Sequence, residues 1–164
     1  MEKKSALFVT QAAMIAALYV VLTYIANGFG LASGVIQVRL SEMLCVLSVF
    51  TPAAIPGLFV GCLLSNLLTG CVIWDVIFGS VATFIGAVGT YLLRRGRFAF
   101  TLPPVLANII IVPFVLQYAY GVKDAVWYLM LTVGVGEIIS ICILGMLLKQ
   151  LLGRYSESIF RYRG

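Results

Sequence analysis

A succession of long apolar segments constrains the fold of this chain more than any other feature, because it leaves little sequence for anything else. Apolar residues make up 62% of the 164 residues and charged residues only 10%, and the mean hydropathy is +1.10. Soluble domains have about 45–50% apolar and about 25% charged residues. The composition therefore indicates a membrane protein. At about 20 residues per crossing, the length allows five or six helices and no separate soluble domain.

Interruptions in the apolar sequence mark six helices. Pro52 and Pro56 separate a short second segment from a short third one, because proline removes a helix donor and clashes with the preceding turn. Pro103 and Pro104 open the fifth segment, since proline is favoured in the first turn of a helix. The expected spans are 6–26, 38–51, 53–68, 74–93, 103–120 and 125–152. The sequence therefore predicts an all-α polytopic membrane protein, a six-helix transmembrane bundle that forms a single domain over residues 1–164.

Basic residues set the expected orientation, because cytoplasmic flanks of membrane helices carry an excess of Lys and Arg. With six spans, only Arg39 and Lys123 of the eleven basic residues fall on one side of the membrane. The other nine share the opposite side: Lys3, Lys4, Arg94, Arg95, Arg97, Lys149, Arg154, Arg161 and Arg163. We therefore predict a multi-pass protein of the plasma membrane with both termini in the cytoplasm. The first segment has no small-residue cleavage site, so we interpret it as a retained span.

Charged and amide side chains within the apolar segments are candidates for a substrate site, because such groups are expensive in a membrane. Glu137 is the deepest, about 12 residues or ~18 Å of helix into the last span. Gly134 and Gly136 flank it and would let a ligand or a helix approach closely. The candidate substrate-binding residues are Arg39, Glu42, Asn66, Asp75, Asn108, Gln117 and Glu137. The alternative is that they form hydrogen bonds between helices, worth about 0.6–2 kcal/mol each.

Two further features near the expected outer surface have competing interpretations. Arg39 and Glu42 are three residues apart on one helical face and could form a local ion pair. Five aromatic residues lie near the expected outer ends of the spans, where an interfacial belt of such residues is common: Trp74, Tyr118, Tyr120, Trp127 and Tyr128. We expect one or two such aromatic side chains to stack on a planar ligand instead.

Several classes of chemistry lack the residues that they need. The chain has no histidine, and its four cysteines form no CxxC motif, so we expect neither a metal site nor a disulfide framework. It also has no GxxxxGK[ST] phosphate loop, hence no ATP site. We predict no cofactor and no enzymatic activity. Energy-driven transport would therefore require another subunit.

Small residues recur at a spacing of four in two segments. The first contains two overlapping AxxxA patterns on adjacent faces, and the third contains Gly57 and Gly61. Small residues four apart let helices pack closely in lipid. The residues of the AxxxA patterns are Ala12, Ala13, Ala16 and Ala17.

These features together resemble one family. The motifs that carry the resemblance are RLSE at 39–42, FTPAAIPG at 50–57, LSNL at 64–67 and DVIFGS at 75–80. With the AxxxA patterns and six spans, the chain is similar over essentially its whole length to the QueT family of S components of energy-coupling factor (ECF) transporters. The resemblance implies a substrate-binding subunit for a queuosine precursor, a 7-deazaguanine base such as queuine or its aminomethyl precursor. It also implies that the AxxxA face docks onto a transmembrane coupling subunit driven by two cytoplasmic ATPase subunits.

The candidate residues suit such a ligand. A deazaguanine presents adjacent N–H donors that one carboxylate accepts as a pair, and Glu137 is our first choice for this edge. The carbonyl oxygen of the ligand needs a donor from one of the amides Asn66, Asn108 or Gln117. A cationic arm would be matched by Asp75 or Glu42, and the flat ring by Trp74 or Trp127.

Three other functions remain open at this point. The chain could be an S component for a different vitamin, or a stand-alone exchanger that uses Glu137 for proton coupling. A small membrane enzyme would need a reactive group of residues, and the sequence contains none that we recognise.

Overall fold

The computed structural model describes residues 2–30, 38–156 and 160, and these residues form helices without any strand. Four helical stretches in this part of the chain are long and apolar enough to cross a membrane, and two shorter helices are also apolar. The predicted all-α polytopic class is confirmed. In chain order the elements are α1 (Glu2–Gly28), η1 (Leu40–Val49), α2 (Ala54–Leu68), α3 (Ile73–Leu92), η2 (Ala99–Thr101), α4 (Leu102–Tyr118), α5 (Val126–Glu137), η3 (Ile138–Gly145) and α6 (Met146–Gly153).

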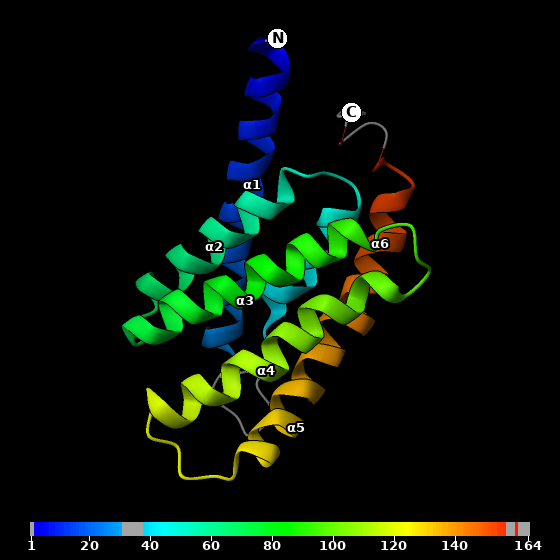
Figure 1. The fold of residues 1–164 in the computed structure, drawn as a ribbon. Helices are drawn as coiled ribbons and strands as arrows, with labels where there is room; N and C mark the ends of the chain where they lie inside the picture. Colours follow the sequence, from blue (N-terminus) through cyan, green and yellow to red (C-terminus); the bar gives the residue numbers. More distant parts are fainter. Residues whose placement is uncertain (1, 31–37, 157–159, 161–164) are drawn as a thin grey trace.

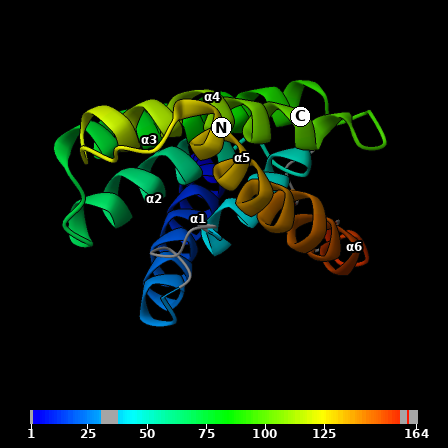
Figure 2. The same cartoon turned by 90° about the horizontal axis from the view of Figure 1, so that it is seen from below.

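The helices form a layer with further helices packed against it. In Figure 1, α2, α3 and α4 lie side by side, with α3 packed against both neighbours. The helix α1 packs against α2, and α5 packs against α4 before continuing through η3 into α6. Figure 2 shows the shorter helix η1 inside this arrangement, where it contacts α1, α2, α3, η3 and α6. The centre of the molecule is therefore the short second segment of the sequence.

The central element η1 is a ten-residue 3₁₀ helix, whereas the sequence indicated an ordinary helical span at 38–51. A 3₁₀ helix rises about 2.0 Å per residue, so ten residues cover roughly 20 Å instead of the ~15 Å of an α-helix. Seven of its residues are buried, including Glu42 and Ser48. The tighter helix lets a short segment present buried side chains to several neighbours at once.

The small residues of the first and third segments meet inside the molecule. A Cβ atom added at Gly57 would lie 2.7 Å from the carbonyl oxygen of Ala12, and one at Gly61 would lie 3.0 Å from Cα of Ala16. Glycine at these positions therefore allows α1 and α2 to touch through their backbones. Ala13 and Ala17 are exposed. The AxxxA region thus has one face inside the molecule and one face outside it.

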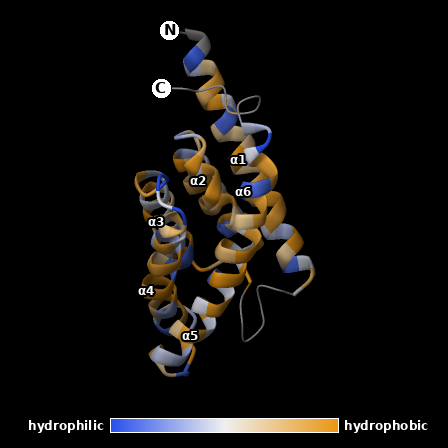
Figure 3. Cartoon of the chain, turned by 90° about the vertical axis from the view of Figure 1, so that its right-hand side faces the viewer, coloured by the Kyte–Doolittle hydropathy of each residue, from blue (hydrophilic) through white to orange (hydrophobic). Residues whose placement is uncertain are grey.

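The first and last described helices end on the same side of the molecule, and the outer surface is apolar. The first turns of α1 and the last turns of α6 are at the same end of the molecule, with the α4–α5 connection at the other end (Figure 1). Hydrophobic residues make up most of each helix (Figure 3), and many large hydrophobic side chains are exposed, as expected for surfaces in contact with lipid.

Candidate substrate-binding site

A polar cavity of about 420 Å³ opens among α1, η1, α2, α3 and the α4–α5 connection. Pockets for small ligands commonly measure about 300–1,000 Å³, so this cavity suits a single aromatic base. Its lining combines a cation, a carboxylate and several neutral polar groups. The lining residues in the described part of the chain are Tyr19, Thr23, Ala26, Asn27, Arg39, Ser41, Asn66, Thr69, Cys71, Asp75, Leu116, Tyr120 and Val122.

A second hollow, of about 460 Å³, lies between α3 and α4. Trp74, Phe78 and Phe114 are among its lining residues, none of which is charged. These side chains are also exposed on the outer surface of the described structure. A hollow of this composition offers a polar ligand few hydrogen-bonding groups and no charge, so the polar cavity is the better candidate site.

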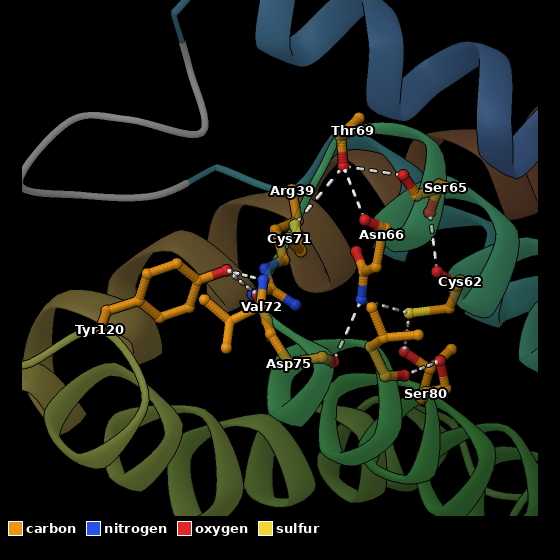
Figure 4. Close-up of polar contacts among 12 residues, drawn as sticks. Arg39, Cys62, Ser65, Asn66, Thr69, Cys71, Val72, Asp75, Ser80 and Tyr120 are labelled. Atoms are coloured by element: carbon orange, nitrogen blue, oxygen red, sulfur yellow. Dashed lines mark hydrogen bonds and ion pairs between the residues drawn. The ribbon is translucent and has the colours of Figure 1, made fainter.

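Arg39 and Asp75 form the charged centre of the polar cavity (Figure 4). Nη2 of Arg39 lies 3.9 Å from Oδ1 of Asp75, with side chains that are 19% and 9% exposed. Asp75 is in the first turn of α3, where the helix dipole favours a carboxylate. A Cβ at Gly79 would lie 3.2 Å from Oδ1 of Asp75 and 3.1 Å from Nδ2 of Asn66, so the missing side chain leaves room for this cluster.

Tyr120 closes one side of the charged centre. Its hydroxyl donates a hydrogen bond of 3.0 Å to Oδ2 of Asp75 and accepts one of 3.4 Å from the backbone N–H of Val72. Burial and the neighbouring Asp75 carboxylate raise the pKa of the Tyr120 phenol, so it keeps its proton and acts as a donor. From sequence we placed Tyr120 only among the aromatic residues of the membrane interface. No local pattern marks it, because its partner is 45 residues away.

Asn66 and its neighbours attach the end of α2 to the start of α3. Nδ2 of Asn66 donates to the carbonyl oxygen of Asp75 at 3.3 Å and lies 3.6 Å from Sγ of Cys62. The hydroxyl of Thr69 donates to the carbonyl oxygen of Ser65 at 2.7 Å (Figure 4). Thr69 and Cys71 also line the cavity, and the sequence analysis did not single out either residue as a ligand contact.

Glu42 does not line the cavity but belongs to a buried layer of polar residues behind the cavity wall. Its carboxylate is fully buried and accepts hydrogen bonds from the hydroxyls of Tyr19 at 2.5 Å and Thr83 at 2.9 Å, and from Sγ of Cys45 at 3.2 Å. These donors come from α1, α3 and η1 itself. Since Tyr19 also lines the cavity, Glu42 fixes part of the cavity wall from behind.

The local ion pair considered for Arg39 and Glu42 is not formed. Arg39 precedes η1 with an extended backbone (φ −90°, ψ 91°), so the three-residue spacing does not place the two side chains on one helical face. Arg39 instead pairs with Asp75, and Glu42 is held by three uncharged donors.

Glu137 and Asn108 also lie outside the cavity lining, in the buried layer with Glu42. Glu137 is 2% exposed and ends α5, and its electrostatic neighbours are Glu42 and Arg39. Nδ2 of Asn108 donates to the carbonyl oxygen of Pro104 at 3.1 Å. The structure therefore gathers Arg39, Asn66 and Asp75 around the cavity and leaves the other deep polar groups behind it.

The remaining candidates lie away from the cavity. Trp127 is 66% exposed and packs edge-on against Tyr128. Trp74 is exposed, stacks on Phe78 at 6.0 Å between ring centroids, and lines the apolar hollow. Gln117 is partly buried and does not line the polar cavity. Successive residues of a helix point about 100° apart, so Trp74 faces outward while Asp75 faces the cavity.

Comparison with known proteins adds the family. A family model described as "QueT transporter" matches residues 9–154. The chain belongs to the QueT transporter family. The family expected from the sequence is thereby confirmed, and with the four long apolar helices it identifies a multi-pass membrane protein.

A curated relative is similar over part of the chain. It is the "Queuosine precursor transporter QueT" of Lactococcus lactis subsp. cremoris (strain MG1363), which is 35% identical over 85 residues. The aligned region covers 52% of this QueT family chain and 50% of the relative, so the chain spans about half the length of the curated relative that it matches. No solved structure matches the chain.

Proposed function

We propose that this chain is the substrate-binding membrane subunit of an ECF transporter that imports a queuosine precursor, a 7-deazaguanine base. Family membership and the name of the Lactococcus relative support the substrate class. The structural observation that carries the proposal is the Arg39–Asp75 pair in a cavity of about 420 Å³.

This pair is complementary to one edge of the base. A deazaguanine presents a carbonyl oxygen, a ring N–H and an exocyclic amino group in a row. Both oxygens of Asp75 can accept from the two N–H groups, and the Arg39 guanidinium can donate to the carbonyl oxygen. Oδ1 of Asp75 has no hydrogen-bond partner among the described residues. We therefore assign the paired N–H contact to Asp75 instead of Glu137, which lies behind the cavity wall.

The neutral polar groups of the cavity complete the site. Asn66, Thr69 and Cys71 lie near the charged pair (Figure 4), and Thr23 and Ser41 also line the cavity. The hydroxyl of Thr23 lies 3.0 Å from Oγ of Ser41, which fixes α1 against η1 at the cavity. These groups suit the hydroxyl or amino substituents of a ligand arm, whereas Trp74 and Trp127 do not reach the cavity.

The proposed transport cycle requires partner subunits. The exposed residues Ala13 and Ala17 offer small side chains on the outer face of α1, which would allow close approach of a transmembrane coupling subunit. Ala12 and Ala16 are already used in the contact with α2. Two ATPase subunits on the cytoplasmic side, where we place both termini, would supply the energy.

The test is equilibrium binding of 7-deazaguanine bases to the purified protein. Asp75→Asn and Arg39→Gln should each weaken binding about 10- to 150-fold, because a hydrogen bond to a charged group contributes roughly 1.5–3 kcal/mol. Asp124→Asn, an exposed acidic residue outside the cavity, is the matched control and should bind as the wild type does. Wild-type affinity in both cavity variants would contradict the assignment of the site.

A transport assay in vesicles distinguishes an S component from a stand-alone exchanger. Reconstituted alone in vesicles, an S component should bind the base without accumulating it. Accumulation driven by a pH gradient would instead support the stand-alone exchanger. Tight binding of a different vitamin, with no binding of deazaguanines, would identify an S component of another specificity.

A further inference from the structure

The connection between α3 and α4 contains a cluster of positive charge, formed by Arg94, Arg95 and Arg97. No acidic residue occurs between Asp75 and Asp124 in the sequence. Within the described part of the chain, none of the three arginines forms an ion pair. Arg95 and Arg97 are exposed. Their charge is therefore not balanced inside the molecule, and an anionic partner has to come from outside it.

The helices on either side place this connection at the boundary of the membrane. The two flanking apolar stretches, Ile73–Leu92 and Ala99–Tyr118, have 20 residues each. At about 1.5 Å per residue each covers roughly 30 Å, which matches the hydrocarbon core of a bilayer, about 30 Å thick. Residues 93–98 then lie just beyond the hydrocarbon, at the level of the lipid headgroups.

Large apolar side chains accompany the arginines on the surface. Leu92, Leu93 and Phe98 are 70%, 44% and 57% exposed. Cζ of Arg97 lies 5.6 Å from the centroid of the Phe98 ring, so a cation and an exposed aromatic ring lie together. Segments that bind the membrane interface combine such groups, because the apolar part enters the acyl chains while the cation stays among the phosphates. A soluble anion would leave the apolar side chains without a partner.

Contacts within the fold hold the connection in place. Oγ1 of Thr90 donates to the carbonyl oxygen of Phe100 at 2.8 Å. Nη1 of Arg94 donates to the carbonyl oxygen of Tyr91 at 2.9 Å, and its guanidinium lies 3.9 Å from the centroid of the Tyr91 ring. Nζ of Lys149 lies 3.9 Å from the centroid of the buried Phe100 ring, which brings a fourth cation from α6 next to η2. Of the three arginines, Arg94 is thus engaged in the fold and the other two remain available.

We propose that Arg95, Arg97 and Phe98 form a binding surface for the phosphate headgroups of anionic phospholipids, with Leu92 and Leu93 among the acyl chains beside them. A guanidinium can donate two N–H groups to the oxygens of one phosphate. Figures 1 and 2 show the connection at one edge of the molecule, where lipid can approach it. Such an anchor would fix the depth of α3 in the membrane. The proposal does not depend on the substrate cavity or on the proposed function.

Native mass spectrometry of the purified protein with added lipids tests the proposal. The probes are phosphatidylglycerol, which is anionic, and phosphatidylcholine with the same acyl chains, which has no net charge. The wild type should prefer phosphatidylglycerol. The double variant Arg95→Gln/Arg97→Gln should lose this preference, because each basic residue near the membrane surface strengthens the attraction roughly fivefold. The control is Lys123→Gln, an exposed lysine in the α4–α5 connection at the other end of the molecule, which should bind both lipids as the wild type does.

Two outcomes would overturn the proposal. Equal preference for phosphatidylglycerol in the double variant and in the Lys123→Gln control would show that lipid does not bind through the arginines. If the double variant kept wild-type lipid binding and lost co-purification of the coupling subunit, the surface would belong to that subunit instead.

A single variant distinguishes a lipid from a soluble anion. Phe98→Ser keeps both arginines and removes an exposed aromatic ring, so it should weaken binding of phosphatidylglycerol. Glycerol phosphate, the soluble counterpart of the headgroup, should compete poorly with the lipid for the wild type. Unchanged lipid binding in Phe98→Ser, together with effective competition by glycerol phosphate, would indicate a general anion site and contradict the lipid surface.

Discussion

Removal of the Tyr19 hydroxyl tests whether the buried Glu42 carboxylate organises the cavity. In Tyr19→Phe the carboxylate loses its 2.5 Å hydrogen bond and keeps those from Thr83 and Cys45. A hydrogen bond to a charged group contributes roughly 1.5–3 kcal/mol. We expect the free energy of unfolding to fall by about that amount, equivalent to a ~10- to 150-fold change in the unfolding equilibrium constant.

The assay is reversible unfolding in mixed detergent micelles, with Tyr118→Phe as the matched control. Tyr118 is 82% exposed, so removal of its hydroxyl should change stability by less than about 0.5 kcal/mol. Combining Tyr19→Phe with Thr83→Val should give a non-additive loss, since both hydroxyls donate to Oε1 of Glu42. Equal stabilities of Tyr19→Phe and Tyr118→Phe would refute the central role of Glu42.

Three other predictions concern packing, partner docking and the ligand. Gly61→Ala should destabilise the fold by about 1–3 kcal/mol, because its Cβ would lie 3.0 Å from Cα of Ala16. The control Gly28→Ala has open space around it and should not destabilise the fold. Thermal unfolding of both variants measures the difference. Ala17→Leu should preserve ligand binding and reduce co-purification of the coupling subunit. Tyr120→Phe frees Oδ2 of Asp75 and should tighten ligand binding in a titration; weaker binding would mean that the hydroxyl contacts the ligand.

The class of the fold and the set of polar residues follow from the sequence because both depend on hydropathy. A long apolar segment must form its hydrogen bonds internally, so α3 at Ile73–Leu92 lies within one residue of the expected 74–93. A charge in such a segment must face other polar groups, so Arg39, Asn66 and Asp75 meet around a cavity. Neither argument depends on how the helices are rotated.

In a membrane protein, hydropathy does not show how each helix is rotated about its own axis. Both the lipid and the core are apolar, so the pattern along α3 did not distinguish the exposed Trp74 from the buried Asp75. The same limit applies to α1, where small residues allow close approach to any helix. Ala16 packs inside the molecule and Ala17 lies on its outer surface. The AxxxA patterns do not distinguish these two positions.

Long-range partners could not be predicted either. The extended backbone at Arg39 and the 3₁₀ geometry of η1 determine that Arg39 meets Asp75 and not Glu42. Both depend on neighbours that are distant in the sequence. Tyr120 is another long-range partner that the sequence does not reveal. It follows α4 and meets Asp75 only once α3 and α4 are packed together.

Mass spectrometry of the small molecules that co-purify with the protein tests the central claim most directly. The wild type, expressed in cells supplied with queuosine precursors, should carry a 7-deazaguanine base, and Asp75→Asn should carry little or none. The Asp124→Asn control should retain the base. A different small molecule in the wild type, or equal retention of the base in Asp75→Asn, would contradict recognition by the Arg39–Asp75 pair.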